Sequence, residues 1–171
     1  MAEVSVLIVY DSVTGNVEAM AEAVKDGVIE AGGTATLKRA DEVDAASLNQ
    51  YDAYAFGSPT HCGTMSTKMN DFFNSKLHKH WGKLGNKVAV AFSSAGGLGG
   101  GSEIVLLSML SVIINFGMIT FGIPDYVSRN VTLHYGSVSI KKPDVDALNS
   151  SRLLGRKLVE HTRVIKKGLA S

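Results

Sequence analysis

Cysteine is nearly absent from this chain. Cys62 is the only one, which excludes an intramolecular disulfide and any zinc or iron–sulfur site built from several cysteines, so no metal site is predicted. An excess of charge of one sign is also missing. The formal net charge of +1 gives no global electrostatic reason to bind nucleic acid.

Long hydrophobic runs are missing too. The most apolar segment, residues 104–114, is too short to span a bilayer and carries Ser108 and Ser111. No basic leader followed by an apolar signal core precedes the first predicted strand. We therefore expect a cytoplasmic protein without a membrane span. Its 171 residues and 45% hydrophobic content fit a single domain over residues 1–171.

Apolar strands alternate with amphipathic segments along the whole chain. The predicted strands are residues 4–9, 34–40, 53–57, 87–92 and 118–123. The predicted helices are residues 17–30, 66–77, 102–116 and a last one from Pro143 past Leu158, and residues 124–142 are expected to form a long loop. Such alternation predicts an α/β fold with a parallel sheet, right-handed crossovers and helices on both faces. Continuous apolar strands fit a sheet that is buried on both sides.

The segment between the first strand and the first helix, residues 12–17, is called the first loop. A strand-to-helix loop of this kind directs backbone N–H groups at one point, and an anion can bind there. It contains neither the Gly-Lys-Ser/Thr of a Walker loop nor the G-x-G-x-x-G of a dinucleotide fingerprint. A terminal monophosphate held by neutral donors remains, with Ser12, Thr14 and Asn16 as side-chain donors. The alternative is an ordinary helix cap by Asn16 or Thr14.

Two further loops follow the third and fourth strands. We call residues 58–63 the second loop and residues 93–101, of which five are glycine, the third loop. In a sheet of order 2-1-3-4-5 the three strands concerned are neighbours, so the three loops would meet at one ligand site. Glycine permits a close approach of the backbone to a planar ligand. The alternative is that the third loop is only a flexible connection.

These residues resemble the flavodoxin superfamily. Residues 12–16 look like its phosphate loop, and residues 57–66, 92–103 and 116–118 resemble the WrbA-like NAD(P)H:quinone oxidoreductases. Some single-domain flavodoxins are also similar, especially across residues 93–101 and 133–136. The resemblance implies a flavodoxin-like three-layer fold, with a five-stranded parallel sheet of order 2-1-3-4-5, and FMN as cofactor.

The resemblance also assigns cofactor-binding residues to all three loops. They are Ser12, Val13, Thr14, Gly15, Asn16, Val17, Pro59, Thr60, His61, Cys62, Gly63, Ser93, Ser94, Ala95, Gly96, Gly97, Gly99 and Gly100.

Two histidines are candidate catalytic residues. His61, in the second loop, has the intrinsic pKa of a proton relay to quinone. His134, beside Tyr135, is expected to approach the ring from residues 124–142 of the same or a neighbouring subunit. The alternative for His61 is a loop histidine with no such role. Cys62 is either a redox-active thiol beside the flavin or a small residue that fills space.

Two functions fit these features. The first is an enzyme that transfers two electrons from NAD(P)H through FMN to a quinone or another small acceptor. The second is a flavodoxin that carries single electrons between protein partners, and an FMN-binding scaffold without turnover is a third. The near-neutral charge and the lack of Trp, Tyr or Phe in residues 58–65 and 93–102 favour the enzyme.

The predicted helix over residues 102–116 is apolar nearly all round, whereas a helix on one face of a sheet needs only one apolar stripe. An exposed second apolar face usually marks a protein contact. We therefore expect a homo-oligomer, a dimer or a tetramer, through this helix. The resemblance to WrbA-like proteins implies assembly through the same region. The alternative is burial of the helix under the long loop of residues 124–142.

Overall fold

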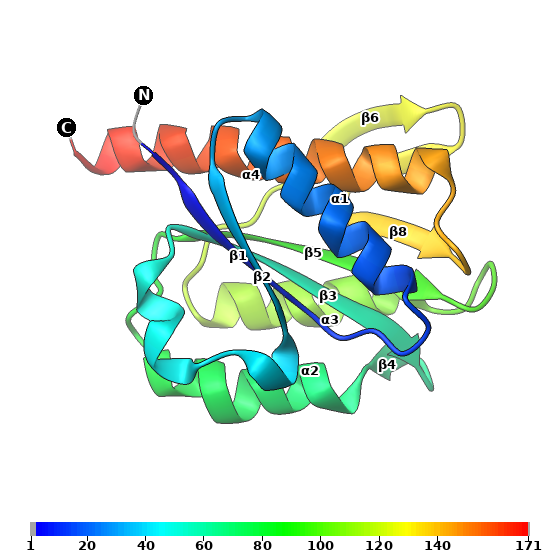
Figure 1. Cartoon of the computed structure of the whole chain (residues 1–171), viewed down its shortest axis with the longest axis horizontal. Helices are drawn as coiled ribbons and strands as arrows, with labels where there is room; N and C mark the ends of the chain where they lie inside the picture. The colour runs from blue at the N-terminus through cyan, green and yellow to red at the C-terminus, as the bar shows by residue number, and fades with distance from the viewer. Residues whose placement is uncertain (1–2, 171) are drawn as a thin grey trace.

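In the computed structural model, which describes residues 3–170, five strands form a parallel sheet of order β2-β1-β3-β5-β8 (Figure 1). Their bounds are Ser5–Tyr10 for β1, Thr34–Arg39 for β2, Ala53–His61 for β3, Val88–Ala95 for β5 and Ser137–Ile140 for β8. The two-residue strand β4 (Thr64–Met65) pairs antiparallel with the end of β3. The predicted order 2-1-3-4-5 is confirmed.

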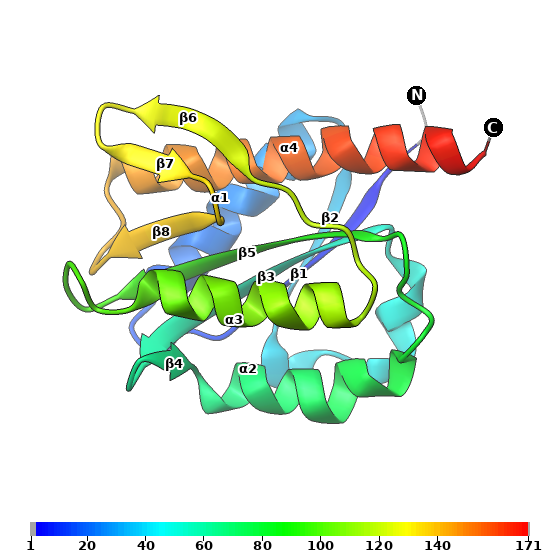
Figure 2. The same ribbon diagram turned by 180° about the vertical axis from the view of Figure 1, so that it is seen from behind.

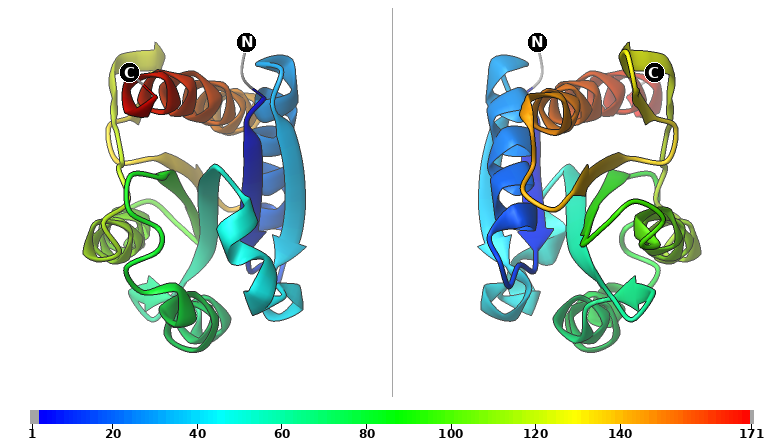
Figure 3. Two further views of the ribbon diagram at one scale, coloured as in Figure 1. Left: turned by 90° about the vertical axis from the view of Figure 1, so that its left-hand side faces the viewer. Right: turned by 90° about the vertical axis from the view of Figure 1, so that its right-hand side faces the viewer.

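Helices cover both faces of the sheet, as the end-on views in Figure 3 show. On one face lie α1 (Asn16–Glu30) and α4 (Val145–Leu169). On the other lie α3 (Ser102–Asn115) and α2 (Thr67–Asp71), which continues as a π-helical turn and a 3₁₀ turn as far as His80. Two short 3₁₀ segments, Ala40–Glu42 and Ala45–Gln50, connect β2 to β3.

Alternation along β1 explains why both faces need helices. Val6 and Ile8 join the core beneath α1 and α4, whereas Leu7 and Val9 join the core beneath α2 and α3. All four side chains are buried, because successive residues of a strand point to opposite faces. The predicted three-layer architecture is therefore a direct result of continuous apolar strands.

Two glycines allow α1 and α4 to pack closely. A Cβ atom on Gly27 would collide with the Arg152 carbonyl, and one on Gly155 would collide with the Val24 carbonyl. The α1 helix ends before Gly32, which has a φ of 71°, a left-handed conformation that glycine adopts readily just past a helix end. In the described part of the chain, no helix is both long and apolar enough to cross a membrane.

The predicted fifth strand over residues 118–123 is wrong. Ile119 makes only an isolated bridge with Val88, and the place of the fifth strand along β5 is taken by β8. Ile123 already belongs to a separate two-stranded sheet. The expected long loop of residues 124–142 is also wrong. It contains β8 and an antiparallel hairpin of β6 (Ile123–Ser128) and β7 (Val131–Leu133), which packs beside α4 (Figure 2).

Candidate functional site

The three loops meet at the carboxyl ends of β1, β3 and β5, at the right-hand end of the molecule in Figure 1. The Asp11 N–H, just before the first loop, donates to the Gly57 carbonyl at 3.0 Å. In the second and third loops, the hydroxyl oxygens of Thr60 and Ser93 are 3.4 Å apart. A Cβ on Gly101 would lie 3.8 Å from the Gly63 Cα. The sequence-predicted loops therefore form one continuous surface.

The first loop leaves its backbone donors free. Gly15, with a φ of 83°, stands at the N-cap of α1, and no side chain of the described residues caps the helix. The first helical hydrogen bond runs from the Ala19 N–H to the Gly15 carbonyl at 3.0 Å, and the amides of residues 13–18 have no acceptor within residues 3–170. The alternative of a cap by Asn16 or Thr14 is therefore wrong. An uncapped helix N-terminus with free amides is a site for an anion.

Ser12 supplies an independent sign of a missing partner. The residue is 6% exposed, and its buried Oγ has no hydrogen-bond partner in the described chain. Leaving a buried hydroxyl unpaired costs free energy, so such an atom calls for an explanation. Thr14 is exposed and Asn16 half-buried, whereas the Val17 side chain lies in the core beneath α1. Only the backbone of Val17 can face a ligand.

Arg39, at the end of β2, lies beside the first loop. The sequence analysis did not predict this neighbour. Its Nη2 donates to the Ser12 carbonyl at 2.6 Å and lies 3.7 Å from Asp11 Oδ1. Its Nη1 is 3.9 Å from Glu18 Oε1, and its guanidinium sits 5.4 Å from the centre of the Tyr10 ring. The parallel register pairs Tyr10 with Arg39, so strand pairing was the signal that could have located it.

Tyr10 joins the same cluster from β1. Its hydroxyl donates to Glu18 Oε1 at 2.7 Å. Burial, followed by this hydrogen bond to a carboxylate, raises the pKa of Tyr10 to about 12. The Tyr10 hydroxyl is therefore a hydrogen-bond donor to Glu18 at neutral pH and well above it.

The second loop ends in a tight hairpin between β3 and β4. His61 pairs with Thr64, and the two residues of the turn, Cys62 and Gly63, have φ values of 50° and 77°. Positive φ at both positions is the requirement of a type I′ turn. His61, Cys62 and Gly63 are exposed, and Pro59 and Thr60 are half-buried. The tip of the hairpin thus faces solvent, at the edge of the surface formed by the three loops.

The third loop is partly a continuation of β5. Ser93 and Ala95 are buried, and Ser93 Oγ donates to the Ser58 carbonyl at 2.9 Å, so this hydroxyl ties β5 to β3. Ser94 is also buried.

The glycines of the third loop differ in backbone conformation and in the space that a side chain would find at each position. Positive φ occurs at Gly99 and Gly101, but at neither Gly97 nor Gly100. A Cβ on Gly97 would meet nothing within 4 Å, whereas one on Gly100 would lie 2.8 Å from the Gly97 carbonyl. Gly96, Gly99 and Gly100 are exposed and Gly97 is half-buried. Gly97 therefore borders open space that a ligand can use.

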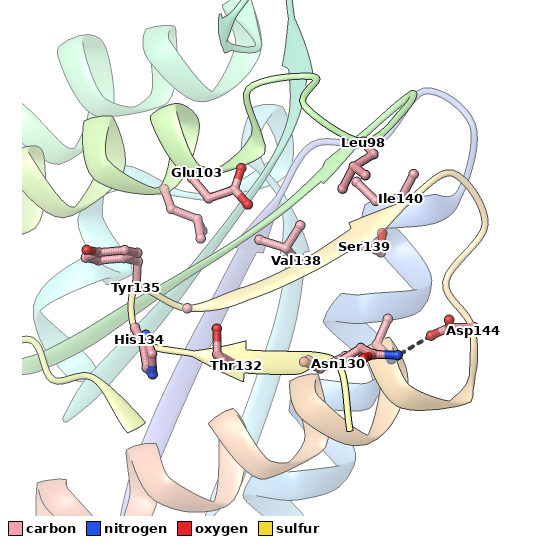
Figure 4. Close-up of a pocket in the computed structure, with 14 residues that line it drawn as sticks. Leu98, Glu103, Asn130, Thr132, His134, Tyr135, Val138, Ser139, Ile140 and Asp144 are labelled. Carbon is pink, nitrogen blue, oxygen red and sulfur yellow. Dashed lines mark hydrogen bonds between the residues drawn. The ribbon is translucent and has the colours of Figure 1, made fainter. Parts of the chain in front are cut away.

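A cavity of about 460 Å³ lies to one side of the third loop (Figure 4). Leu98 and Glu103 line one side, and His134 and Tyr135 enter from the segment between β7 and β8. Its volume is in the range of small-molecule sites.

A second cavity, of about 390 Å³, lies between the first loop and the start of α2. Its lining residues are Asp11, Ser12, Val13, Arg39, His61, Ser66, Thr67 and Lys68. His61 and His134 therefore border different cavities, and the structure does not bring the two candidate catalytic histidines together.

Comparisons with known proteins agree on one family. A family model described as flavodoxin matches residues 8–102. The chain is 42% identical to a flavodoxin of Aquifex aeolicus, over 95% of this chain and 89% of that one. It is 32% identical to an NAD(P)H dehydrogenase (quinone) of Archaeoglobus fulgidus, over 91% and 95% of the two chains.

Solved structures show the same fold. A flavodoxin, WrbA-like protein from Agrobacterium tumefaciens superposes with a TM-score of 0.78 at 25% identity, over 94% of this chain and 98% of that one. A flavodoxin from the domain Archaea superposes with a TM-score of 0.76 at 24% identity, over 93% and 99%.

Proposed function

Because the chain belongs to the flavodoxin family, we propose that it is an FMN-dependent oxidoreductase that passes two electrons from NADH or NADPH to a quinone. The observation that carries the proposal is the first loop, where the amides of residues 13–18 and the buried Ser12 Oγ lack partners within residues 3–170. These are neutral donors gathered at a helix N-terminus, which suits the terminal phosphate of FMN.

Each loop has its own part in holding the cofactor. Backbone amides of the first loop, with the hydroxyls of Ser12 and Thr14 and the Asn16 amide, would bind the phosphate. The second and third loops would hold the ring, with Gly97 bordering the space that the ring needs. FMN, when bound, supplies the hydride and electron chemistry, and the protein supplies binding, orientation and electrostatics. Amides of the third loop would stabilise negative charge on the ring, as in an oxyanion hole.

Three features support an enzyme over a carrier. No Trp, Tyr or Phe occurs in residues 58–65 or 93–102, so no large aromatic from these loops covers the ring. The net charge of +1 lacks the strong acidity that a docking carrier presents to basic partners. Several relatives near 30% identity over more than nine-tenths of this chain are named NAD(P)H dehydrogenase (quinone).

We propose that the small acceptor binds in the cavity beside the third loop. Its wall carries the exposed imidazole of His134, the Tyr135 hydroxyl and the Glu103 carboxylate, all able to exchange or orient protons. His61, on the opposite side of the site, is the second candidate proton donor. A cytoplasmic location remains a prediction from the sequence.

A one-electron carrier is the second candidate function. The relative at 42% identity is named a flavodoxin, and that identity exceeds the 32% shared with the quinone reductase of Archaeoglobus fulgidus. This role would need a protein partner to dock over the surface formed by the three loops.

Anaerobic mixing of the FMN-loaded protein with NADH or NADPH distinguishes the two functions. An enzyme loses its flavin absorbance on mixing, regains it when benzoquinone is added, and turns over at roughly 1 s⁻¹ or faster. Free FMN at the same concentration is the control. Protein whose flavin is reduced by dithionite but by neither nicotinamide contradicts the enzyme. In that case, a redox titration with electron uptake at two separate potentials supports the carrier.

We also propose that α3 forms a homo-oligomer interface. Ile104, Leu107 and Ile114 on its outer face are 61%, 47% and 62% exposed. The segment of residues 124–142 does not cover them, because its hairpin packs beside α4. An apolar strip of this kind marks a protein contact, and a second copy of the chain presents the same strip for a symmetric contact.

A further inference from the structure

Arg39 is the one cation within hydrogen-bond distance of the first loop in the described chain, and it contacts the loop through the Ser12 carbonyl. Its side chain is 30% exposed and donates to the Ser12 carbonyl oxygen at 2.6 Å. The guanidinium also lies over the Tyr10 ring, so its position is fixed by contacts on two sides. A cation held by a ring, a carbonyl and two carboxylates is pre-organised before any ligand arrives.

The bond to the Ser12 carbonyl determines where the next amide points. A trans peptide is planar, and its C=O and N–H groups point in opposite directions. When Arg39 holds the Ser12 C=O, the Val13 N–H is therefore turned away from Arg39. That amide belongs to the set of residues 13–18 that lack an acceptor within residues 3–170. Arg39 thus fixes the direction of a donor that the phosphate needs.

Arg39 also balances two carboxylates that lie close to the first loop. Asp11 is 4% exposed, and its carboxylate is 3.7 Å from the guanidinium. Glu18, in the first turn of α1, is 3.9 Å away. A phosphate bound at this loop would be repelled by both carboxylates if they were uncompensated. Lys68, which borders the same cavity, is already paired with Asp41 at 2.7 Å.

We propose that Arg39 is a positioning residue of the phosphate site: it orients the Ser12–Val13 peptide and neutralises Asp11, so that the first loop accepts a dianionic phosphate through neutral donors. This role rests on the proposed function, because it concerns the phosphate of FMN. This role predicts that Arg39 contributes to the binding of the phosphate and not to the binding of the ring.

Titrating FMN and riboflavin in parallel isolates that contribution, since riboflavin has the ring and the ribityl chain but no phosphate. For Arg39→Gln, the FMN affinity should fall by about tenfold or more, and the riboflavin affinity should change by less than about twofold. Arg39→Lys keeps the charge but loses the planar fork, so it should lie between Gln and wild type. Lys38→Gln, on the exposed neighbour in β2, is the matched control and should change neither affinity.

A second variant tests the charge balance. In Asp11→Asn/Arg39→Gln the unpaired buried carboxylate is gone, so part of the lost FMN affinity should return. If wild-type protein binds FMN and both Arg39 variants keep the wild-type affinity for FMN, the role of Arg39 is overturned and the proposed function stands. Equal losses for both flavins also overturn the role of Arg39, because they indicate a general structural defect. Wild-type protein that binds neither flavin overturns the proposed function as well.

Discussion

The Nζ atom of Lys166, near the end of α4, lies 2.7 Å from Oδ1 of Asp52, immediately before β3. The other carboxylate oxygen of Asp52 accepts from the Ser5 N–H at 2.9 Å, at the start of β1. Burial, the largest single influence, raises the pKa of Asp52, but the hydrogen bonds from Lys166 and Ser5 outweigh it and hold this pKa below its usual value. The ionised carboxylate therefore ties α4 to the amino-terminal end of the sheet.

A lowered pKa makes this contribution sensitive to acid. The stabilisation is fully present above the unfolded pKa of about 3.9 and is lost as the pH falls through the lower folded value. Asp52→Asn should lower the free energy of unfolding near neutral pH by about 1 kcal/mol, and the difference should shrink below about pH 3. Urea unfolding across this pH range measures it.

The matched control for Asp52 is Asp125→Asn. Asp125 is exposed, has a φ of 63° that Asn tolerates, and has no ion pair within residues 3–170. If the free energies of unfolding of the wild type and Asp52→Asn differ by the same amount at every pH, the Lys166–Asp52 pair contributes no acid-sensitive stability.

Gly97→Val should impair flavin binding without impairing folding. A Cβ there meets nothing within 4 Å, and the backbone φ is not in the left-handed region, so the side chain would project into the space assigned to the ring. Flavin titration should therefore show weaker binding, whereas thermal unfolding should stay as in the wild type. Gly85→Val, on an exposed glycine before β5, is the control. Wild-type flavin affinity in Gly97→Val would make the third loop a connector only.

Gly100→Val is expected to act differently. Its Cβ would lie 2.8 Å from the Gly97 carbonyl, so the third loop itself must shift. We expect weaker flavin binding together with a small loss of stability, of about 1–3 kcal/mol. Undisturbed binding and melting in this variant would mean that the conformation of the loop has no bearing on the cofactor.

Thr14→Val should weaken FMN binding by roughly tenfold to a hundredfold, or about 1.5–3 kcal/mol, because it removes one donor to a charged phosphate. Thr34→Val is the control, because it makes the same substitution at an exposed threonine at the start of β2, away from the loops. An FMN titration of both variants is sufficient. Equal affinity in Thr14→Val and wild type would remove Thr14 from the site.

Oligomerisation through α3 is tested by light scattering. We expect a multiple of the 18.1 kDa chain mass at micromolar concentration, and the monomer mass for Leu107→Lys, which places a charge in the exposed apolar strip. Val164→Lys, on an exposed apolar residue of α4, should leave the oligomer intact. A monomeric wild-type protein would contradict this interface.

Hydrophobic pattern was enough to predict four of the five sheet strands, and the resemblance to the flavodoxin superfamily implied their order, but the pattern missed β8. Ser137 and Ser139 are buried there, and Ser137 is satisfied by hydroxyl contacts of 2.9 and 2.8 Å to Ser150 and Ser151 of α4. A strand whose buried positions are serine carries no apolar signal. The more apolar residues 118–123 carry the pattern of a strand instead, although within the described residues only Ile119 forms a bridge to the sheet.

The three loops could be predicted because each follows an apolar strand directly. Arg39 could not, because 27 residues separate it from the Ser12 carbonyl that it binds. Its place depends on the register between β1 and β2, which sequence pattern alone does not fix. The role of Ser93 was also hidden, since only the structure shows its hydroxyl bonded to the Ser58 carbonyl.

The most direct test is a titration of the purified protein with FMN and FAD under identical conditions, followed by fluorescence. The first loop should close on a terminal phosphate, and it lacks the glycine fingerprint that a pyrophosphate requires. FMN should therefore bind at micromolar concentration or below, and FAD should bind at least about a hundredfold more weakly. Equal or tighter binding of FAD, or no binding of either flavin, would contradict a phosphate site at residues 12–17.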